Sequence, residues 1–407
     1  MNFNNLALHL SFASLVILAF ATFTSLSISA GAHIFILVPG IYFFFKHFKQ
    51  KRQLPWSAKV LFLLFVTVIA SVLVNTAIIE HPVRNILKGK YFLFALFFLV
   101  SFKEVFKNYM NDKRIKILLW LFLIATTLAS LSGIIGLYTG FNPIKFKAAC
   151  HPTRACGVYG MYMTYGYGIS LFMVLLSGAL LYRDKFQKYV PTWLLGAAFV
   201  INLAGLHLSY ARGGLLGFLV ALPFFFIKKN IKLFFGVMIA GVLVLGGTML
   251  ASESVRDMFF KRGHSNDQRL AFYEAAYRAW SEKPILGWGF RNFEPNTVKI
   301  KEKYNIAHTT YGGHAHNNLL EHLASTGIIG FVLVGFFHLF WLLEMWRRDD
   351  WIGDMILPFV VSFTVAGLFQ YTFGDGENLF LITAIYALSL IPPAKGESFV
   401  QRSPDTV

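Results

Sequence analysis

The sequence predicts an all-α polytopic membrane protein with about twelve transmembrane helices and one long outer loop. Hydrophobic residues make up 56% of the 407 residues and charged residues only 14%, whereas an ordinary soluble domain carries about 25% charged residues. Apolar stretches long enough to cross the ~30 Å hydrocarbon layer recur throughout the chain. Basic residues fall in short runs between these stretches, as they do in loops that flank transmembrane helices.

Two other classes of protein are excluded by the same patterns. The net charge of +17 would suit a nucleic-acid-binding protein, but such proteins gather Lys and Arg on a folded soluble surface, so no nucleic-acid partner is expected. The first 45 residues contain no Asp, Glu, Lys or Arg. A secretory signal peptide begins with basic residues and has one short apolar core. This segment is long enough for two spans, which predicts retained helices.

Twelve segments are long and apolar enough to be spans. They lie near residues 6–28, 31–46, 59–79, 86–102, 117–138, 157–182, 189–208, 213–227, 232–250, 318–345, 353–372 and 377–392. We therefore expect a chain divided into 1–250 (helices one to nine), 251–317 (the long outer loop), 318–392 (helices ten to twelve) and 393–407 (a short cytoplasmic tail).

The distribution of basic residues predicts the orientation. With the N-terminus inside, the inner loops hold 18 Lys and Arg. The short outer loops hold seven, namely Arg84, Lys88, Lys90, Lys145, Lys147, Arg154 and Arg212. Because inner loops carry the excess of Lys and Arg, both termini are expected in the cytoplasm, and an even number of spans agrees.

The outer loop 251–317 contains ten Lys and Arg and seven Asp and Glu. Within it, residues 269–280 predict an amphipathic helix, because apolar side chains recur at helical spacing. These are Leu270, Tyr273, Ala276, Tyr277 and Trp280. A loop of this length in a compact protein is usually functional, and we expect it to pack over the outer face of the bundle.

The two cysteines, Cys150 and Cys156, lie in the outer loop 139–156. In an oxidising compartment they could close a small disulfide ring. Two unpaired thiols are the alternative, and the sequence leaves both open. Two cysteines alone do not make a metal site, and no metal or other cofactor is expected.

His314 and His316 end the long loop, immediately before span ten. Asn317 and Asn318 are good N-cap residues, and Asn318 with Glu321 resembles a capping box. The positive end of the helix dipole disfavours an imidazolium, and a neutral imidazole can act as a general base. The alternative is a pair of interfacial histidines without a catalytic role.

Several arginines are candidates for binding an anion on the same side. Arg212 ends the short outer loop before span eight, at the bilayer edge, and is followed by two glycines that would let a large ligand approach the backbone. Arg269, Arg278 and Arg291 lie in the long loop, and Arg154 in a shorter one. Guanidinium groups suit phosphate recognition, although an ordinary solvated basic face is the alternative for each.

The histidines and arginines together predict chemistry on the outer face. The sequence contains no Walker-type or HExxH motif. A substrate that arrives already activated, with a phosphate leaving group on a lipid carrier, would suit arginine side chains and one base.

Three short patterns give the chain a resemblance to the bacterial O-antigen ligases and their relatives. The pattern H-N-x9-G-x-x-G resembles that family's signature, an R-x3-L element accompanies it, and an arginine precedes a P-x-x-G-x-G turn. These residues are His316, Asn317, Gly327 and Gly330; Arg212 and Leu216; and Arg269, Pro284, Gly287 and Gly289. The likeness covers roughly residues 150–345 in motifs and the whole chain in topology.

The resemblance implies a metal-independent, inverting glycosyltransferase of lipopolysaccharide biosynthesis in the Gram-negative inner membrane. Its donor would be an undecaprenyl-diphosphate-linked glycan and its acceptor a lipid A-core sugar, with membrane lipids around it and the active site facing the periplasm. By the same resemblance, His316 would be the general base, and Arg212 and Arg269 would hold the diphosphate. His314, Asn317, Arg154, Arg278 and Arg291 are the candidates for binding substrate.

Three alternatives remain at this level. An O-antigen polymerase differs mainly in its acceptor, and the R-x3-L element favours the ligase. A protein O-oligosaccharyltransferase typically carries a sizeable extra C-terminal region, which is not expected here. A secondary transporter tends to show repeat symmetry and ionisable groups at the bilayer midplane, whereas here the span centres are nearly free of charge.

Overall fold

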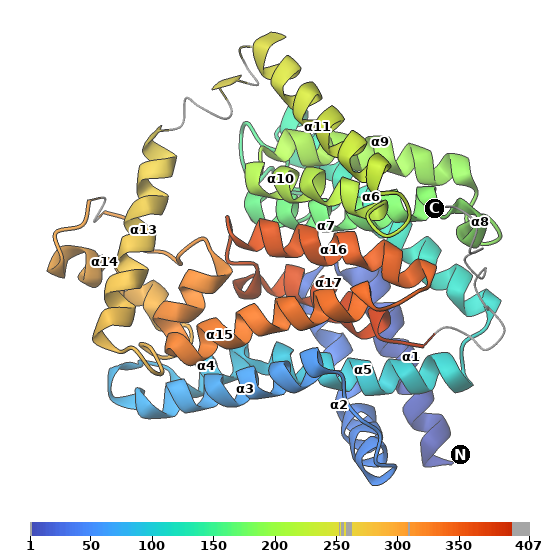
Figure 1. Ribbon diagram of the computed structural model, residues 1–407, viewed down its shortest axis with the longest axis horizontal. Helices are drawn as coiled ribbons and strands as arrows, with labels where there is room; N and C mark the ends of the chain where they lie inside the picture. The colour runs from blue at the N-terminus through green and yellow to red at the C-terminus, as the bar shows by residue number, and fades with distance from the viewer. Residues whose placement is uncertain (1, 252, 254–255, 258–262, 308–309, 393–407) are drawn as a thin grey trace.

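Helices occupy all twelve segments that the sequence predicts as spans, which confirms the all-α polytopic membrane class. The computed structural model describes residues 2–251, 253, 256–257, 263–307 and 310–392 (Figure 1). The helices in those segments are α1 (Phe3–Ala21), α2 (Leu26–Lys49), α3 (Trp56–Val74), α4 (Pro82–Lys88), α5 (Lys90–Asn108), α6 (Asp112–Thr139), α7 (Tyr162–Leu181), α9 (Thr192–Ser209), α10 (Arg212–Ala221) continued by the 3-10 helix η2 (Leu222–Phe225), α11 (Ile231–Ala251), α15 (Asn318–Trp346), α16 (Trp351–Gly367) and α17 (Gly376–Ser389).

Within the described part of the chain, nine helical segments are long and apolar enough to cross a membrane. Residues Arg212–Phe225 and Trp351–Gly367 form shorter apolar helices, and α17 has 14 residues. Apart from α13 and α14 in the long loop, the other described elements are short: α8 (Arg183–Phe186), the 3-10 helices η1 (Thr76–Ile78) and η3 (Thr372–Gly374), and a two-stranded antiparallel sheet of β1 (Phe141–Asn142) and β2 (Lys147–Ala148). The predicted tail 393–407 lies outside the described residues.

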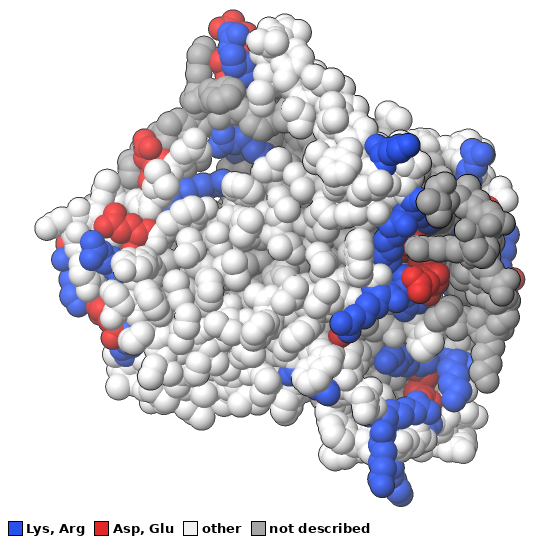
Figure 2. Space-filling view, in the orientation of Figure 1, with Lys and Arg blue, Asp and Glu red and all other residues white. Residues whose placement is uncertain are grey.

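Charged side chains gather at the two ends of the bundle and leave a broad band nearly free of them on the face shown in Figure 2. One end, which we call the basic end, holds the loops between α2 and α3 and between α15 and α16. There Arg348 donates to the carbonyls of Ser389 and Ile391, and Arg52 pairs with Glu104 at 2.8 Å. The opposite end, the loop end, carries α13 (Gly263–Glu282) and α14 (Phe293–Lys303) (Figure 1).

The turn between the first two helices lies earlier than the sequence predicts. The apolar pattern places this boundary near residues 28–31, but α1 ends at Ala21 and α2 begins at Leu26. Ser25 is the N-cap of α2, and its side chain accepts a hydrogen bond from the backbone N–H of Ile28. Since a serine cap satisfies an N–H that the helix leaves unpaired, it sets the boundary inside a continuous apolar run.

The predicted amphipathic segment 269–280 lies within α13, but its buried face differs from the expected one. Leu270 is 63% exposed and Tyr277 is 52% exposed. Ala276 is buried as expected, but the other buried side chains are Ala271, Phe272, Ala275 and Ala279, which are small except for one aromatic ring. Alanine lets α13 approach α14 and α15 closely, so burial here follows side-chain size rather than hydrophobicity alone.

A kink in α15 connects the long loop to the bundle. Gly327 has φ +68° and ψ −164° inside the helix, and this break frees two backbone groups. Ile328 N–H donates to the carbonyl of Pro284 at 2.8 Å, and Trp288 N–H donates to the carbonyl of Ala324 at 2.9 Å. A β-carbon at Gly327 would collide with the carbonyl of Ile285. The P-x-x-G-x-G turn is therefore bound directly to the backbone of α15.

The two cysteines form a disulfide in the loop between α6 and α7. Cys150 and Cys156 have Cα atoms 6.3 Å apart. The neighbouring Asn142 side chain donates to the carbonyl of Gly157 at 2.7 Å and accepts from Ser132 at 2.7 Å. These bonds fix the loop against the end of α6.

Candidate active site

His316 lies in the extended segment that leads into α15, with an unusual backbone conformation. Its φ is +47°, a region that costs a residue with a β-carbon about 1–2 kcal/mol. Asn317 is the N-cap of α15, and its side chain accepts from the N–H groups of Leu319 and Leu320. The cap thus places His316 immediately outside the helix, and such local strain is typical of functional positions.

The capping box predicted between Asn318 and Glu321 does not form, because both side chains bind other partners. Asn318 is buried, and its side chain donates to Thr372 Oγ1 at 2.8 Å and accepts from Phe373 N–H at 3.3 Å. Glu321 accepts instead from Ala315 N–H at 2.8 Å. The acidic side chain reaches back past the N-cap because Asn317 alone satisfies the first turn. Glu321 and Asn318 therefore hold the segment that contains His314 and His316, here called the histidine-bearing segment, from both sides.

The His316 ring is fixed by contacts from three elements. Its Nδ1 lies 2.8 Å from Oε1 of Gln370, in the loop after α16. The ring of Phe272 on α13 lies edge-on at 5.6 Å between centroids, and the ring of His314 lies at 4.3 Å. The position of the imidazole is therefore determined by tertiary packing.

The pKa of His316 is lowered to about 4. Burial is the main cause; the positive charge of His314 lowers the pKa further, the bond to Gln370 opposes these effects, and Arg269 adds to them. The ring is therefore neutral near pH 7, as the sequence analysis expects. Burial is the main cause, and neighbouring cations add to it.

Helix α13 passes near Arg212 at its start and near His316 further along. Near its start, Asn266 Oδ1 accepts a hydrogen bond from Arg212 at 3.4 Å. About one turn later comes Arg269, whose charge acts on His316. Tyr273, one turn further, donates from its hydroxyl to the carbonyl of Leu368 at 3.3 Å. The long loop thus places Arg269 between Arg212 and His316.

Tyr167 on α7 interacts electrostatically with both Arg212 and Arg269. Both guanidinium groups act electrostatically on its hydroxyl, Arg269 more strongly than Arg212. Tyr167 is buried, with 1% of its surface exposed, and a β-carbon at Gly213 would collide with its hydroxyl. Another at Gly214 would lie 3.0 Å from the carbonyl of Gly166. The glycines after Arg212 therefore admit helix α7, and the sequence interpretation that they admit a ligand is wrong.

A second cluster surrounds His314. Its Nδ1 lies 3.9 Å from Oε1 of Glu294 on α14, and Arg291 lies 3.9 Å from the other oxygen of Glu294. Arg291 also donates to the carbonyl of Gly374 at 3.3 Å, and its guanidinium lies 5.7 Å from the centre of the Tyr371 ring. Arg291 therefore connects the long loop with the loop between α16 and α17.

His314 and Glu294 form a charged pair. Burial acts to lower the pKa of His314, but hydrogen bonding to Glu294 and the charges of Glu321, Glu294 and Asp375 outweigh it and raise the pKa above 6.5. His314 in turn is the main cause that lowers the pKa of Glu294 to about 2. The pKa values of the two neighbouring histidines are therefore shifted in opposite directions.

The region that contains these residues matches a known family. Residues 197–335 match the family model described as O-antigen ligase. This match over residues 197–335 supports membership of the O-antigen ligase/polymerase superfamily. No curated protein matched the chain. The matched region runs from α9 into α15 and includes Arg212, Arg269 and His316, whereas Gln370 lies beyond it.

Two further arginine candidates have other contacts. Arg278 pairs with Glu274 on its own helix at 3.5 Å and lies 5.2 Å from the centre of the Tyr304 ring. Arg154 lies 4.1 Å from the centre of the Tyr162 ring at the start of α7. For both, a role in substrate binding stays a prediction.

Sequence reasoning missed several residues that the fold brings to the site. Gln370, Tyr371 and Asp375 come from the short loop between α16 and α17, whose polar stretch between two apolar helices is the signal that could have identified them. Lys301 is fully buried on α14, with its ammonium group 3.6 Å from the centre of the Phe272 ring. No sequence pattern marks it.

This arrangement can deprotonate a neutral hydroxyl and stabilise an anion. The imidazole of His316 supplies a proton acceptor, and Arg269 supplies a fixed positive charge beside it. Among the described residues, no group of three or more His, Cys, Asp or Glu is arranged to hold a metal ion.

Proposed function

We propose that this protein transfers a glycan from undecaprenyl diphosphate to a sugar of the lipid A core, as an O-antigen ligase. It would act in the inner membrane of a Gram-negative bacterium, with both termini in the cytoplasm and the loop end facing the periplasm. The observation that carries the proposal is the course of α13, which holds Arg269 between Arg212 and the neutral imidazole of His316.

In the proposed reaction, His316 takes the proton of the acceptor hydroxyl. The hydroxyl oxygen attacks the anomeric carbon of the donor from the face opposite the diphosphate, so the configuration inverts. The bond between the anomeric carbon and the diphosphate oxygen breaks, and the diphosphate leaves with the electron pair. Arg212 and Arg269 stabilise its growing charge, and such electrostatic stabilisation is often the largest catalytic contribution.

The charges of the free site support this sequence of events. A neutral His316 is ready to accept a proton, but a pKa of about 4 makes it a weak base. The negative diphosphate of a bound donor would offset the positive charges of Arg269 and His314. Since nearby negative charge favours the protonated imidazole, donor binding would raise the basicity of His316 when it is needed.

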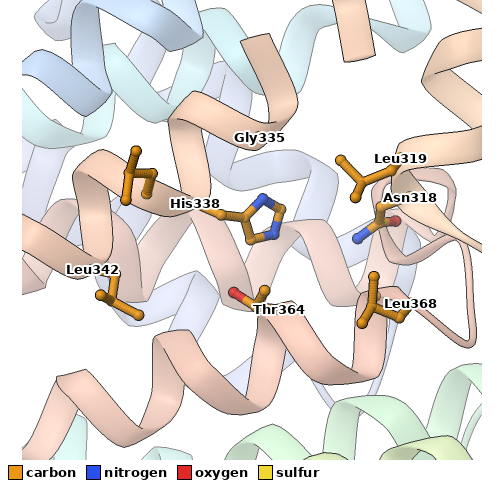
Figure 3. Close-up of a pocket in the computed structure, with 9 residues that line it drawn as sticks. Asn318, Leu319, Gly335, His338, Leu342, Thr364 and Leu368 are labelled. Carbon is orange, nitrogen blue, oxygen red and sulfur yellow. The ribbon is translucent and has the colours of Figure 1, made fainter. Parts of the chain in front are cut away.

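An apolar pocket beside the site supports a lipid-linked donor. It lies between α15 and α16, has a volume of about 270 Å³, and is lined at one end by Asn318, Leu319 and Leu368 (Figure 3). Asn317 donates to the carbonyl of Leu368 at 3.1 Å, so the pocket begins where the histidine-bearing segment meets α16. Its lining suits an isoprenoid chain.

An O-antigen polymerase would use the same donor and the same residues, with a second carrier-linked glycan as acceptor. Deletion of the gene, followed by gel analysis of surface polysaccharide, separates the two activities. Free core with glycan accumulating on the carrier supports the ligase, whereas core carrying a single repeat supports the polymerase. Unchanged surface polysaccharide would contradict both.

A further inference from the structure

Among the described contacts, Gln370 is the only residue outside the histidine-bearing segment whose side chain hydrogen-bonds His316. It lies 54 positions further along the chain and is 3% exposed. The backbone around it is fixed, since its carbonyl accepts from Thr372 N–H at 3.0 Å. A buried amide in a fixed loop is suited to setting the orientation of its partner.

The orientation of the Gln370 amide follows from its second partner. Its side chain also interacts with the carboxyl group of Asp375, which precedes α17, and this interaction opposes the burial that raises the pKa of Asp375 to about 6. A carboxylate only accepts hydrogen bonds, so the amide NH₂ group of Gln370 faces Asp375. The amide oxygen therefore faces His316, in agreement with the 2.8 Å distance from Oε1 to Nδ1.

A carbonyl oxygen cannot donate, so the nitrogen that faces it must carry the proton. In a neutral imidazole only one nitrogen is protonated, and the other holds the lone pair. We propose that Gln370 is a positioning residue that fixes His316 in the Nδ1–H tautomer, so that Nε2 is the nitrogen that accepts the proton of the acceptor sugar. The catalytic part of this inference rests on the proposed function.

The charged neighbours of His316 do not replace this effect. His314 on the same segment, Arg269 on α13 and Glu294 on α14 act on the ring as charges. A charge changes how readily the ring is protonated, but the hydrogen-bond partner of one nitrogen decides which nitrogen holds the proton in the neutral form. Phe272 packs against the ring without a hydrogen-bonding group.

The test compares Gln370→Met, which removes the acceptor at similar length, with Gln370→Glu, which keeps an acceptor oxygen. In the full chain in lipid nanodiscs, Gln370→Met should lower kcat about 10–100-fold with KM nearly unchanged. Gln370→Glu should retain activity at neutral pH and move the acid side of the pH–rate profile to higher pH, because its carboxylate favours the imidazolium. The exposed Gln187→Met is the matched control.

A second measurement reads the tautomer without relying on activity. Nitrogen-15 NMR of histidine-labelled protein, with the His316→Ala spectrum subtracted, should show a protonated Nδ1 in the wild type and a mixture of tautomers in Gln370→Met. A protonated Nε2 in the wild type, or an unchanged tautomer and wild-type kcat in Gln370→Met, would overturn the inference. Loss of the proposed transferase activity alone would not alter the NMR result, so the two failures are distinguishable.

Discussion

The imidazole rings of His314 and His316 lie 4.3 Å apart, and their pKa values shift in opposite directions. Glu294 stabilises a proton on His314, while burial and the resulting positive charge keep His316 neutral. Two adjacent histidines thus have different electrostatic roles that their sequence does not distinguish. This pair leads to two predictions about pH.

The first prediction concerns the acid side of the pH–rate profile. Only neutral His316 can accept a proton, so activity is lost as pH falls through its pKa and rises again with pH. With that pKa lowered to about 4, kcat/KM, which reports the free enzyme, should stay nearly constant from neutral pH down to about one unit above this value. A midpoint near the ordinary value of 6.5 would contradict the assignment of His316 as the base.

The second prediction concerns Glu294. Its replacement by Gln removes the carboxylate that holds the proton on His314, so the pKa of His314 should fall. A neutral His314 no longer repels a proton on His316, and the acid side of the kcat/KM profile should move to higher pH. As a control, Lys303→Gln breaks the exposed ion pair between Lys303 on α14 and Glu282 on α13. This change should leave the profile in place. An unchanged profile in Glu294→Gln would mean that the charge on His314 does not change the pKa of His316.

The third prediction compares arginines. Arg212→Ala and Arg269→Ala should each lower glycan transfer by about 10²–10³-fold, since each removes a contact to the departing charge, and His316→Ala should abolish it. Arg183→Ala is the control, because Arg183 is an exposed arginine on α8 outside the candidate site; its activity should be near that of the wild type. Transfer and membrane protein level are measured together in vesicles. Normal transfer by Arg269→Ala would assign the diphosphate to another arginine.

The fourth prediction tests the kink in α15. Gly327→Ala places a β-carbon against the carbonyl of Ile285 and in a left-handed backbone conformation, which alone costs about 1–2 kcal/mol. The midpoint of thermal unfolding in detergent should fall. Gly335→Ala on the same helix meets no atom within 4 Å and should be neutral or slightly stabilising. Equal midpoints for the two variants would mean that the 284–288 turn does not depend on the kink.

The fifth prediction concerns metal ions. The proposed reaction uses an imidazole and guanidinium groups alone, so EDTA should leave the transfer rate of the purified protein unchanged. Inhibition that added Mg²⁺ or Mn²⁺ reverses would require a metal ion in the mechanism.

Much of the fold follows from the sequence because a transmembrane helix is a local requirement. Any segment in hydrocarbon must satisfy its own backbone hydrogen bonds and present apolar side chains, so length and composition predict all twelve helices. The errors arise where another local rule intervened. Ser25 ends an apolar run early by capping α2, and alanines rather than Leu270 and Tyr277 form the buried face of α13.

The candidate site could be predicted only in part. The histidine motif and Arg212 stand out because they are polar residues beside apolar spans. The sequence also suggested a neutral His316, and the structure shows burial as the main cause. The contact of Gln370 with His316, the burial of Lys301 and the pairing of His314 with Glu294 could not be predicted, since each depends on contacts between elements that are distant in sequence.

By itself, the sequence determined the membrane class, the apolar segments that form helices, the excess of Lys and Arg in the predicted inner loops, and the motifs that resemble the O-antigen ligase family. Only the tertiary structure decided which arginine lies beside His316, which histidine holds a proton, and what the motif glycines do. The physical reason is range: hydrophobicity and capping act within a few turns of helix. Burial, charge pairing and backbone contacts such as that between Gly327 and the 284–288 turn exist only once distant segments have packed together.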